Sequence, residues 1–320
     1  MEKAETAFLA AALAVSKKTD TGFGHLSVPG ESEHVMTHHV SAGSGAEEAA
    51  NNALTELRYF LLDMDGTVYL GPAPIPGAAE FLRYLRDTAR PHLFFTNNPT
   101  KDAARYAEKL HGMGIDAAPG DILTSGEATV RYLQKATDHQ RLFVLGNDSF
   151  TLEVTRGGFT LDDMAPDAVV LAFDTTLTYA KLERACLLLR EGLPFIATNP
   201  DRVCPTEYGF IPDCGAMAAL IEAATGRTPT YIGKPFPTMI RMGLDKLGAT
   251  PKATAMVGDR LYTDMEMAYR AGTQSVLVLS GETTPADLET AARRPDHVFD
   301  SVAALHAALE AKDRHTQQES

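Results

Sequence analysis

From Leu57 to about Ala311, short apolar runs alternate with segments whose apolar residues recur at helical spacing. The apolar runs are nearly continuous, which is typical of strands that are buried on both faces of a parallel sheet. The pattern therefore predicts an α/β fold with a Rossmann-like, doubly wound parallel sheet. The predicted strands are 58–63, 92–96, 230–233, 253–258 and 274–280, with helices at 77–88, 101–114 and 237–248 among them.

The middle of the chain carries a second set of the same kind. Apolar runs at 141–146, 167–173 and 194–198 accompany helical patterns at 178–192 and 215–226. This is enough material for a second, smaller α/β unit inserted into the first. We therefore predict a core of residues 54–138 and 229–312, with an inserted cap at 139–228.

The two ends of the chain lack this periodicity. Residues 1–53 are rich in Gly, Ser, Thr, His and Glu, and we predict a disordered extension there. Residues 313–320 are predicted to be a polar tail of the same kind. The apolar run at 7–15 is too short to span a membrane, and glutamates precede it where a signal peptide carries basic residues. We expect a cytoplasmic protein without a membrane partner.

The composition limits the classes of ligand that the protein is expected to bind. The chain has 320 residues, and its formal net charge of −13 gives no bulk attraction for nucleic acid or anionic lipid. An anionic ligand must then be held by a local cluster of cations, a metal or backbone N–H groups. The three cysteines form neither a metal motif nor a disulfide framework, so we expect reduced thiols.

Candidate chemistry lies where predicted strands end, which is where open parallel sheets bind ligands. In "FLLDMDGTVYLG", Asp63 and Asp65 bracket one residue just after an apolar run, which is more than a turn requires. In "TNNPT", Thr96 and Asn97 end the next strand, and the helix that follows would offer N–H donors to an anion. A second interpretation of this stretch is that Thr100 simply caps the helix that follows.

Two further strand ends follow late in the chain. Lys234 stands between a glycine and a proline in "YIGKPFP", where it is not on a solvated helix face. In "MVGDRLYTD", Asp259 follows a strand, and Gly258 is expected to let the backbone turn sharply toward the site. Asp264 either caps the next helix or supports the site.

Taken together, these groups indicate a site for a hard cation and a phosphate. Converging carboxylates favour Mg²⁺ with oxygen ligands, and a lysine with helix N–H groups favours a phosphate. An aspartate in such a site can also attack phosphorus and form an acyl phosphate.

The four motifs, in this order on alternating strands and helices, resemble the haloacid dehalogenase superfamily of phosphohydrolases. The resemblance runs from about Leu57 to about Ala311. "PIPGAAEFL", "FIATNPD" and "IPDCGAMAALIEAATGRTPTYIGKP" are similar to the NagD-like, p-nitrophenyl-phosphatase-like subgroup, which carries an α/β cap between the second and third motifs.

The resemblance implies a role for each motif residue. Asp63 corresponds to the nucleophile, and Asp65 to the general acid and base. Thr96, with the backbone at Asn97, corresponds to the phosphate-binding motif, and Lys234 neutralises charge on nucleophile and phosphate. The implied Mg²⁺ ligands are Asp63, Asp65 through its carbonyl oxygen, and Asp259, with Asp264 in a supporting role.

The resemblance also suggests what enters the site. Asn199 and Asp201 lie in the loop 198–215 that resembles the substrate-specificity loop, so they are candidates for contacting the leaving group. Cys204 stands where relatives acting on pyridoxal phosphate or phosphoglycolate often carry histidine, which makes those substrates less expected. Asp65 favours phosphate esters over carbon–halogen bonds, because an alkoxide must be protonated as it leaves.

The expected function is a Mg²⁺-dependent phosphatase of small phosphomonoesters, such as nucleoside monophosphates or sugar phosphates, through an aspartyl-phosphate. Two alternatives stay open: a phosphotransferase or phosphomutase of the same superfamily, and a non-catalytic protein that binds a phosphorylated metabolite. Whether copies of the chain associate through the cap is also open.

Overall fold

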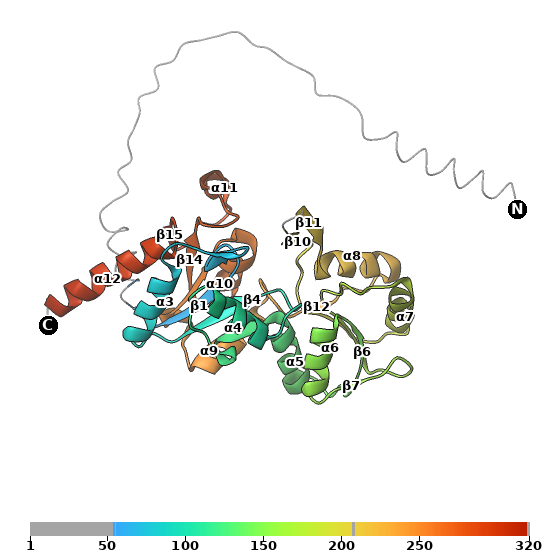
Figure 1. Ribbon diagram of the computed structural model, residues 1–320. Coiled ribbons are helices and arrows are strands. Elements are labelled where there is room, and N and C mark those ends of the chain that lie inside the picture. Colours follow the sequence, from blue (N-terminus) through green and yellow to red (C-terminus); the bar gives the residue numbers. More distant parts are fainter. Residues whose placement is uncertain (1–53, 55, 207–208, 319–320) are drawn as a thin grey trace, which may run out of the picture. The chain divides into compact units, whose positions relative to one another are not determined.

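The computed structural model describes residue 54, residues 56–206 and residues 209–318. The predicted extension at 1–53 lies outside the described residues. All described residues belong to one compact unit of the chain. Within it, two parallel sheets each carry their own helices (Figure 1).

The larger sheet is the predicted core sheet. Its six strands are all parallel to their neighbours and run in the order β15-β14-β13-β1-β4-β5. The chain builds outward from β1 in one direction and then returns to build outward in the other, so β1 is where the strand order reverses. Ligands of such sheets bind at this switch point. The strands are β1 (Tyr59–Asp63), β4 (His92–Thr96), β5 (Ile122–Thr124), β13 (Thr254–Gly258), β14 (Gln274–Val278) and β15 (His297–Phe299).

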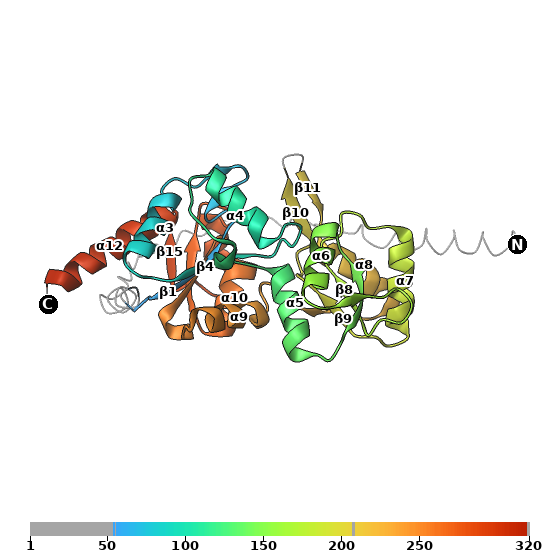
Figure 2. The ribbon, with the colours of Figure 1, turned by 60° about the horizontal axis from the view of Figure 1, so that its bottom comes forward.

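Helices cover both faces of the core sheet, which explains why its strands are apolar throughout. Phe60 and Leu62 of β1 pack with helices α3 (Ala78–Asp87), α4 (Ala103–Gly112) and α12 (Val302–Gln318). Leu61 faces the opposite way, toward α9 (Pro237–Leu247) and α10 (Glu266–Ala271). Figure 2 shows α3 and α4 on one side of the sheet and α9 and α10 on the other. Successive strand residues point to opposite faces, so both must be apolar.

The smaller sheet is formed by the insertion. Its strand order is β12-β9-β8-β6-β7, again with parallel pairs. The strands are β6 (Arg141–Leu145), β7 (Thr160–Leu161), β8 (Ala168–Leu171), β9 (Phe195–Ala197) and β12 (Thr230–Tyr231). Helices α7 (Tyr179–Arg190) and α8 (Cys214–Thr225) bury one face of it. Helices α5 (Ser125–Ala136) and α6 (Asp148–Arg156) contact the other.

Short elements complete the described chain. The hairpin β10 (Val203–Thr206) and β11 (Gly209–Pro212) leaves the smaller sheet before α8, and β2 (Tyr69–Leu70) pairs with β3 (Ala73–Pro74) after β1. The others are α11 (Pro285–Thr290), the 3₁₀ turns at Pro119–Asp121 and Pro251–Ala253, and a π-helical turn at Leu261–Met265. Among the residues described here, no helix combines the length and apolar character needed to cross a bilayer.

The structure corrects the placement of one predicted strand. Residues 230–233 were expected among the core strands, but Thr230 and Tyr231 pair with Ile196 and Ala197 of the smaller sheet. The inserted unit therefore extends past the predicted limit at residue 228 to include β12. For the start of the insertion and the outer limits of the core, we keep the boundaries proposed from the sequence. Strands β5 and β15 escaped prediction because each is only three residues long.

The polar tail predicted at 313–320 is also wrong over the part that the structure describes. Helix α12 continues to Gln318. Asp313 holds this end of the helix on the core, because Arg90 donates to its two carboxylate oxygens at 2.7 and 2.8 Å and Tyr84 donates at 2.6 Å. These long-range contacts stabilise a segment whose composition alone suggested disorder.

Candidate active site

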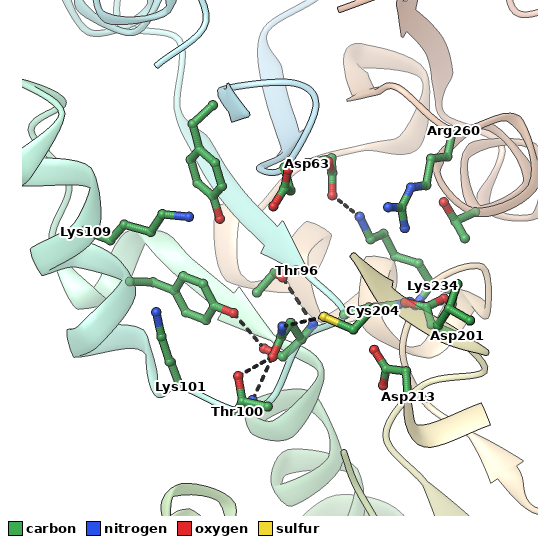
Figure 3. Close-up of a pocket in the computed structure, with 17 residues that line it drawn as sticks. Asp63, Thr96, Thr100, Lys101, Lys109, Asp201, Cys204, Asp213, Lys234 and Arg260 are labelled. Carbon is green, nitrogen blue, oxygen red and sulfur yellow. Dashed lines mark hydrogen bonds and ion pairs between the residues drawn. The ribbon is translucent and has the colours of Figure 1, made fainter. Parts of the chain in front are cut away.

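The polar residues predicted at the strand ends meet at the carboxyl edge of the core sheet. They line a pocket of about 240 Å³, together with residues of the cap hairpin and of α4 (Figure 3). The lining residues are Asp63, Asp65, Tyr69, Thr96, Asn97, Asn98, Thr100, Lys101, Tyr106, Lys109, Asp201, Val203, Cys204, Asp213, Lys234, Arg260 and Thr263. Asp259 and Asp264 lie behind this surface, both buried.

Lys234 joins two buried carboxylates. Its Nζ forms ion pairs with Asp63 Oδ1 and, at 2.8 Å, with Asp264 Oδ1. Burial raises the pKa of Asp63, the nearby carboxylates of Asp264 and Asp259 add to that rise, and Lys234 opposes it. Burial disfavours the charged lysine, yet Asp264 and Asp63 raise the pKa of Lys234 above its ordinary value. The two carboxyl groups therefore keep the Lys234 ammonium fully charged next to Asp63, although the site is buried.

Asp259 has the features of a metal ligand. Its Oδ2 accepts a hydrogen bond from the Glu282 N–H at 2.6 Å, while its buried Oδ1 has no hydrogen-bond partner. Oxygens of Asp63, Asp259 and Asp264 all lie within 4.8 Å of one another. Burial, followed by the charge of Asp264, raises the pKa of Asp259 to about 6. An orphaned buried carboxylate oxygen next to two other acids fits a hard divalent cation.

Two glycines make room for these carboxylates. Gly66 has φ of +91°, and a Cβ there would lie 2.4 Å from Asp259 Oδ2, so both the backbone and the space require glycine. Gly258 was expected to provide a sharp turn, and that expectation is wrong, because it is the last residue of the extended strand β13. A Cβ at Gly258 would lie 2.3 Å from Asp264 Cγ, so it provides space instead.

The two aspartates of the first motif lie in different environments. Asp63 is the buried last residue of β1, whereas Asp65 is exposed on the pocket wall. The backbone at Asp65 forms a bridge with Tyr69, and the Gly66 N–H bonds to the Tyr69 carbonyl at 2.7 Å. This tight turn sends the two side chains to different surroundings, which is the arrangement that lets neighbouring carboxyls play separate parts.

Asn97 connects three segments of the chain. Its side-chain carbonyl accepts from the Lys234 N–H at 2.8 Å, and its Nδ2 donates to the Lys234 carbonyl at 2.9 Å and to Asp201 at 3.1 Å. Its backbone carbonyl accepts from Asn199 Nδ2 at 2.8 Å. Asn97 therefore fixes both Lys234 and the cap loop against the end of β4.

Thr96 and Thr100 are positioned by the same loop. The Thr96 hydroxyl accepts from the Asn98 N–H at 3.2 Å, and Thr100 donates to Asn98 Oδ1 at 2.6 Å. Thr100 is not the helix cap that the sequence offered as an alternative. Asp102 caps α4 by accepting from the Arg105 N–H at 3.0 Å.

The two predicted cap residues separate in the structure. Asp201 lines the pocket, but Asn199 is fully buried outside the lining. Asn199 donates to Asn97 and accepts from the Asp201 N–H at 3.0 Å, so its hydrogen bonds shape the loop. The expectation that Asn199 contacts the leaving group is therefore replaced by a positioning role.

Sequence reasoning missed several pocket residues. Arg260 directly follows Asp259, and Asp213 caps α8 by accepting from the Cys214 N–H at 2.5 Å. Burial raises the pKa of Asp213 to about 7. Tyr106 and Lys109 lie three residues apart on one face of α4 and both line the pocket. Their helical spacing, soon after the polar end of β4, could have identified them from the sequence.

Comparisons with known proteins agree with this architecture. A family model described as haloacid dehalogenase-like hydrolase matches residues 60–160, and a related HAD-hydrolase-like model matches 231–305. An acid sugar phosphatase of Staphylococcus haemolyticus is 36% identical over 260 residues, which is 81% of this chain and 98% of that protein.

Solved structures give the same result. A 4-nitrophenylphosphatase from Thermotoga maritima superposes with a TM-score of 0.78 at 44% identity, covering 80% of this chain and 99% of that one. NagD from Escherichia coli K-12 gives 0.73 at 34% identity, covering 77% and 97%.

The chain belongs to the haloacid dehalogenase-like hydrolases. The predicted superfamily, its NagD-like subgroup and the α/β fold are confirmed. The prediction of an enzyme of the phosphoric monoester hydrolase class agrees with the names of these relatives.

Proposed function

We propose that the protein is a Mg²⁺-dependent phosphatase that hydrolyses small phosphomonoesters through an aspartyl-phosphate at Asp63. The observation that carries the proposal is the buried Asp63–Lys234–Asp264 array beside the orphaned oxygen of Asp259, in which Asp63 and Lys234 reach the pocket and the other two acids lie behind its lining. The relatives named acid sugar phosphatase and 4-nitrophenylphosphatase support this class of reaction.

Asp63 is the proposed nucleophile. Its carboxylate attacks phosphorus, the bond from phosphorus to the ester oxygen breaks, and the phosphoryl group is held on Asp63 until water removes it. Lys234 opposes the rise in the pKa of the buried Asp63 carboxyl and offsets repulsion from the phosphate oxygens. Mg²⁺, held by Asp63, Asp259 and the carbonyl of Asp65, would supply further neutralisation of the charge on those oxygens.

Asp65 is the proposed general acid and base. It is exposed to the pocket, whereas Asp63 is buried and paired with Lys234. Asp65 can therefore deliver a proton to the leaving oxygen and later take one from the attacking water. Thr96 and the backbone at Asn97 are the proposed phosphate-positioning groups, and Asp264 supports Lys234 through their 2.8 Å contact.

The pocket favours a small polar leaving group. Its volume of about 240 Å³ suits a short ester, and Asp201, Asn98 and Thr100 present oxygen and nitrogen atoms that bind hydroxyls. We place sugar phosphates first, because of the named relatives, and nucleoside monophosphates second.

A phosphate-release screen with Mg²⁺ tests the proposal. We expect release from p-nitrophenyl phosphate and from several sugar phosphates, with a phosphate adduct on Asp63 detected by mass spectrometry after acid quench. Adding an acceptor alcohol distinguishes the phosphotransferase alternative, because that activity would give a new phosphate ester. Tight binding of esters without any turnover would instead favour a non-catalytic binding protein.

A further inference from the structure

Two lysines on one wall of the pocket are not explained by the proposed chemistry. Lys101 precedes α4 and Lys109 lies on α4, and both line the pocket that contains Asp63. Figure 3 shows them reaching in from one side, while Lys234 and Arg260 reach in from the other. Lys234 and Arg260 already have carboxylate partners, in Asp63, Asp264 and Glu282.

Neither lysine has a carboxylate within ion-pair distance in the described part of the chain. None of the ion pairs within the described part of the chain includes Lys101 or Lys109. The neighbouring Arg105 on α4 differs, because it is exposed and pairs with Glu108 at 3.4 Å. Burial lowers the pKa of Lys109, the carboxylate of Asp65 opposes this, and the charge of Lys101 adds to the lowering. A pair of unpaired cations facing a pocket is stabilised by an anion between them.

Lys109 is held in place for such a role. Its Nζ lies 3.5 Å from the centre of the Tyr69 ring, and Tyr69 is buried next to the first motif. A cation above an aromatic ring is attracted to its face, which limits the freedom of a long side chain. Tyr106 lies between the two lysines in the sequence and donates to the Asn98 carbonyl at 3.1 Å, which stiffens the same wall.

The rest of the pocket indicates which part of a substrate faces these lysines. Lys234 marks the end of the pocket where the phosphoryl group is transferred, on the opposite side from α4. Asp201 and Asp213 form the cap wall, where carboxyl groups accept from hydroxyls and offer an anion no positive charge. An additional anion on the leaving group is therefore favoured along α4 and disfavoured elsewhere.

We propose that Lys101 and Lys109 form a second anion subsite, which selects phosphate esters whose leaving group carries a carboxylate or a further phosphate. This inference rests on the proposed phosphatase function. It names the substrate class within that function: bisphosphates, or phosphorylated acids longer than phosphoglycolate, of short polyols and sugars.

Matched ester pairs test the subsite. 3-Phosphoglycerate and glycerol 3-phosphate differ only in a carboxylate against a hydroxymethyl group, and 6-phosphogluconate and sorbitol 6-phosphate repeat this difference on a longer chain. Fructose 1,6-bisphosphate and fructose 6-phosphate test a second phosphate. We expect kcat/KM to favour the member with the additional carboxylate or phosphate in at least one pair by roughly 10-fold, as charge-assisted hydrogen bonds give. The pair that shows it identifies carboxylate or phosphate.

Variants connect the preference to the lysines. In the K101M/K109M double variant we expect the preference to fall toward one, chiefly through KM, while K101R/K109R retains it. Methionine keeps the length of the stem and removes the charge. K135M/K252M is the matched control, because both lysines are exposed and lie outside this pocket.

The outcomes separate the two proposals. Phosphate release without preference in any pair, or a preference that K101M/K109M leaves intact, would overturn the subsite alone. No release from any of the six esters would overturn the proposed function and the subsite with it.

Discussion

Two buried aspartates at strand ends of the two sheets, the proposed nucleophile Asp63 and Asp174, differ in how the protein bonds their carboxylate oxygens. Asp63 ends β1 of the core sheet, and Asp174 follows β8 of the cap sheet. Each forms an ion pair with a lysine, Lys234 and Lys181 respectively. By sequence alone, both are acids that follow an apolar run.

Their remaining contacts differ. Asp174 Oδ1 accepts from the Thr176 N–H at 2.8 Å and from its hydroxyl at 2.7 Å, and Oδ2 accepts from Lys181 at 2.8 Å. Among the described residues, Asp63 Oδ2 accepts only a 3.4 Å contact from the Thr67 hydroxyl, and Asp63 lines a pocket. An acid whose oxygens are saturated by its own loop stabilises that loop, whereas one with spare bonding capacity at a pocket can react.

The largest expected effect comes from removing the nucleophile. D63N should lower kcat for p-nitrophenyl phosphate by at least about 10³-fold, because an amide cannot form the acyl phosphate. Phosphate release with Mg²⁺ measures this, and circular dichroism checks the fold. Retention of full activity would contradict the mechanism.

The matched variant in the cap is D174N. It should keep kcat/KM within a factor of two, but lower the free energy of unfolding by roughly 2 kcal/mol, because it breaks a mostly buried ion pair. Urea denaturation measures the loss. If D174N instead abolished turnover in a folded protein, the contrast between the two aspartates would be wrong.

Removing the metal site should have the next largest effect. Chelation should abolish phosphate release, and added Mg²⁺ should restore it. For the wild type, Mg²⁺ at 100 times its Kd should raise Tm by roughly 5 °C, because binding to the folded state alone stabilises it. D259N should lose this rise in Tm, because a neutral amide replaces the carboxylate whose oxygen has no hydrogen-bond partner. An equal rise in Tm for the wild type and D259N would show that Mg²⁺ does not bind at Asp259.

A third test separates Asp65 from Asp63. D65N should lower kcat for alkyl phosphates by about 10²-fold or more, since general acid catalysis contributes that much. The loss should be clearly smaller for p-nitrophenyl phosphate, whose leaving group departs without a proton. The ratio of the two losses is the readout. Equal losses for both esters would count against a general acid at Asp65.

The smallest expected effect concerns Asp213, another buried acid of the cap. Its pKa is raised to about 7 in the folded protein by burial, so the folded state holds a proton that the unfolded chain releases near pH 4. The free energy of unfolding should therefore fall by roughly 1–3 kcal/mol as pH rises from 4 to 7. D213N keeps the cap of α8 and should show a flatter profile in urea titrations across that range. Parallel profiles for the two proteins would exclude this contribution.

Much of the fold could be predicted because its signals are local. The alternation of apolar runs and helical patterns identified β1, β4, β13 and β14 and the inserted sheet. The first motif and Asp259 were found because each follows a strand of the core sheet, and parallel strands end at one edge. Lys234 was also found at a strand end, although that strand belongs to the smaller sheet. The prediction failed for 230–233, because an apolar run does not reveal which of two sheets it joins.

Only the tertiary structure showed which side chains the site residues contact. The sequence determined an α/β chain with an insertion and its superfamily, and it predicted a site of the Mg²⁺ and phosphate type. It did not show that Asn199 is buried against Asn97, that Lys234 spans Asp63 and Asp264, or that Lys101 and Lys109 face the same pocket. Hydrogen bonds and ion pairs between residues distant in sequence depend on the packing of both sheets. Periodicity records only which face of an element is apolar, and it carries no information about which distant side chain that element will meet.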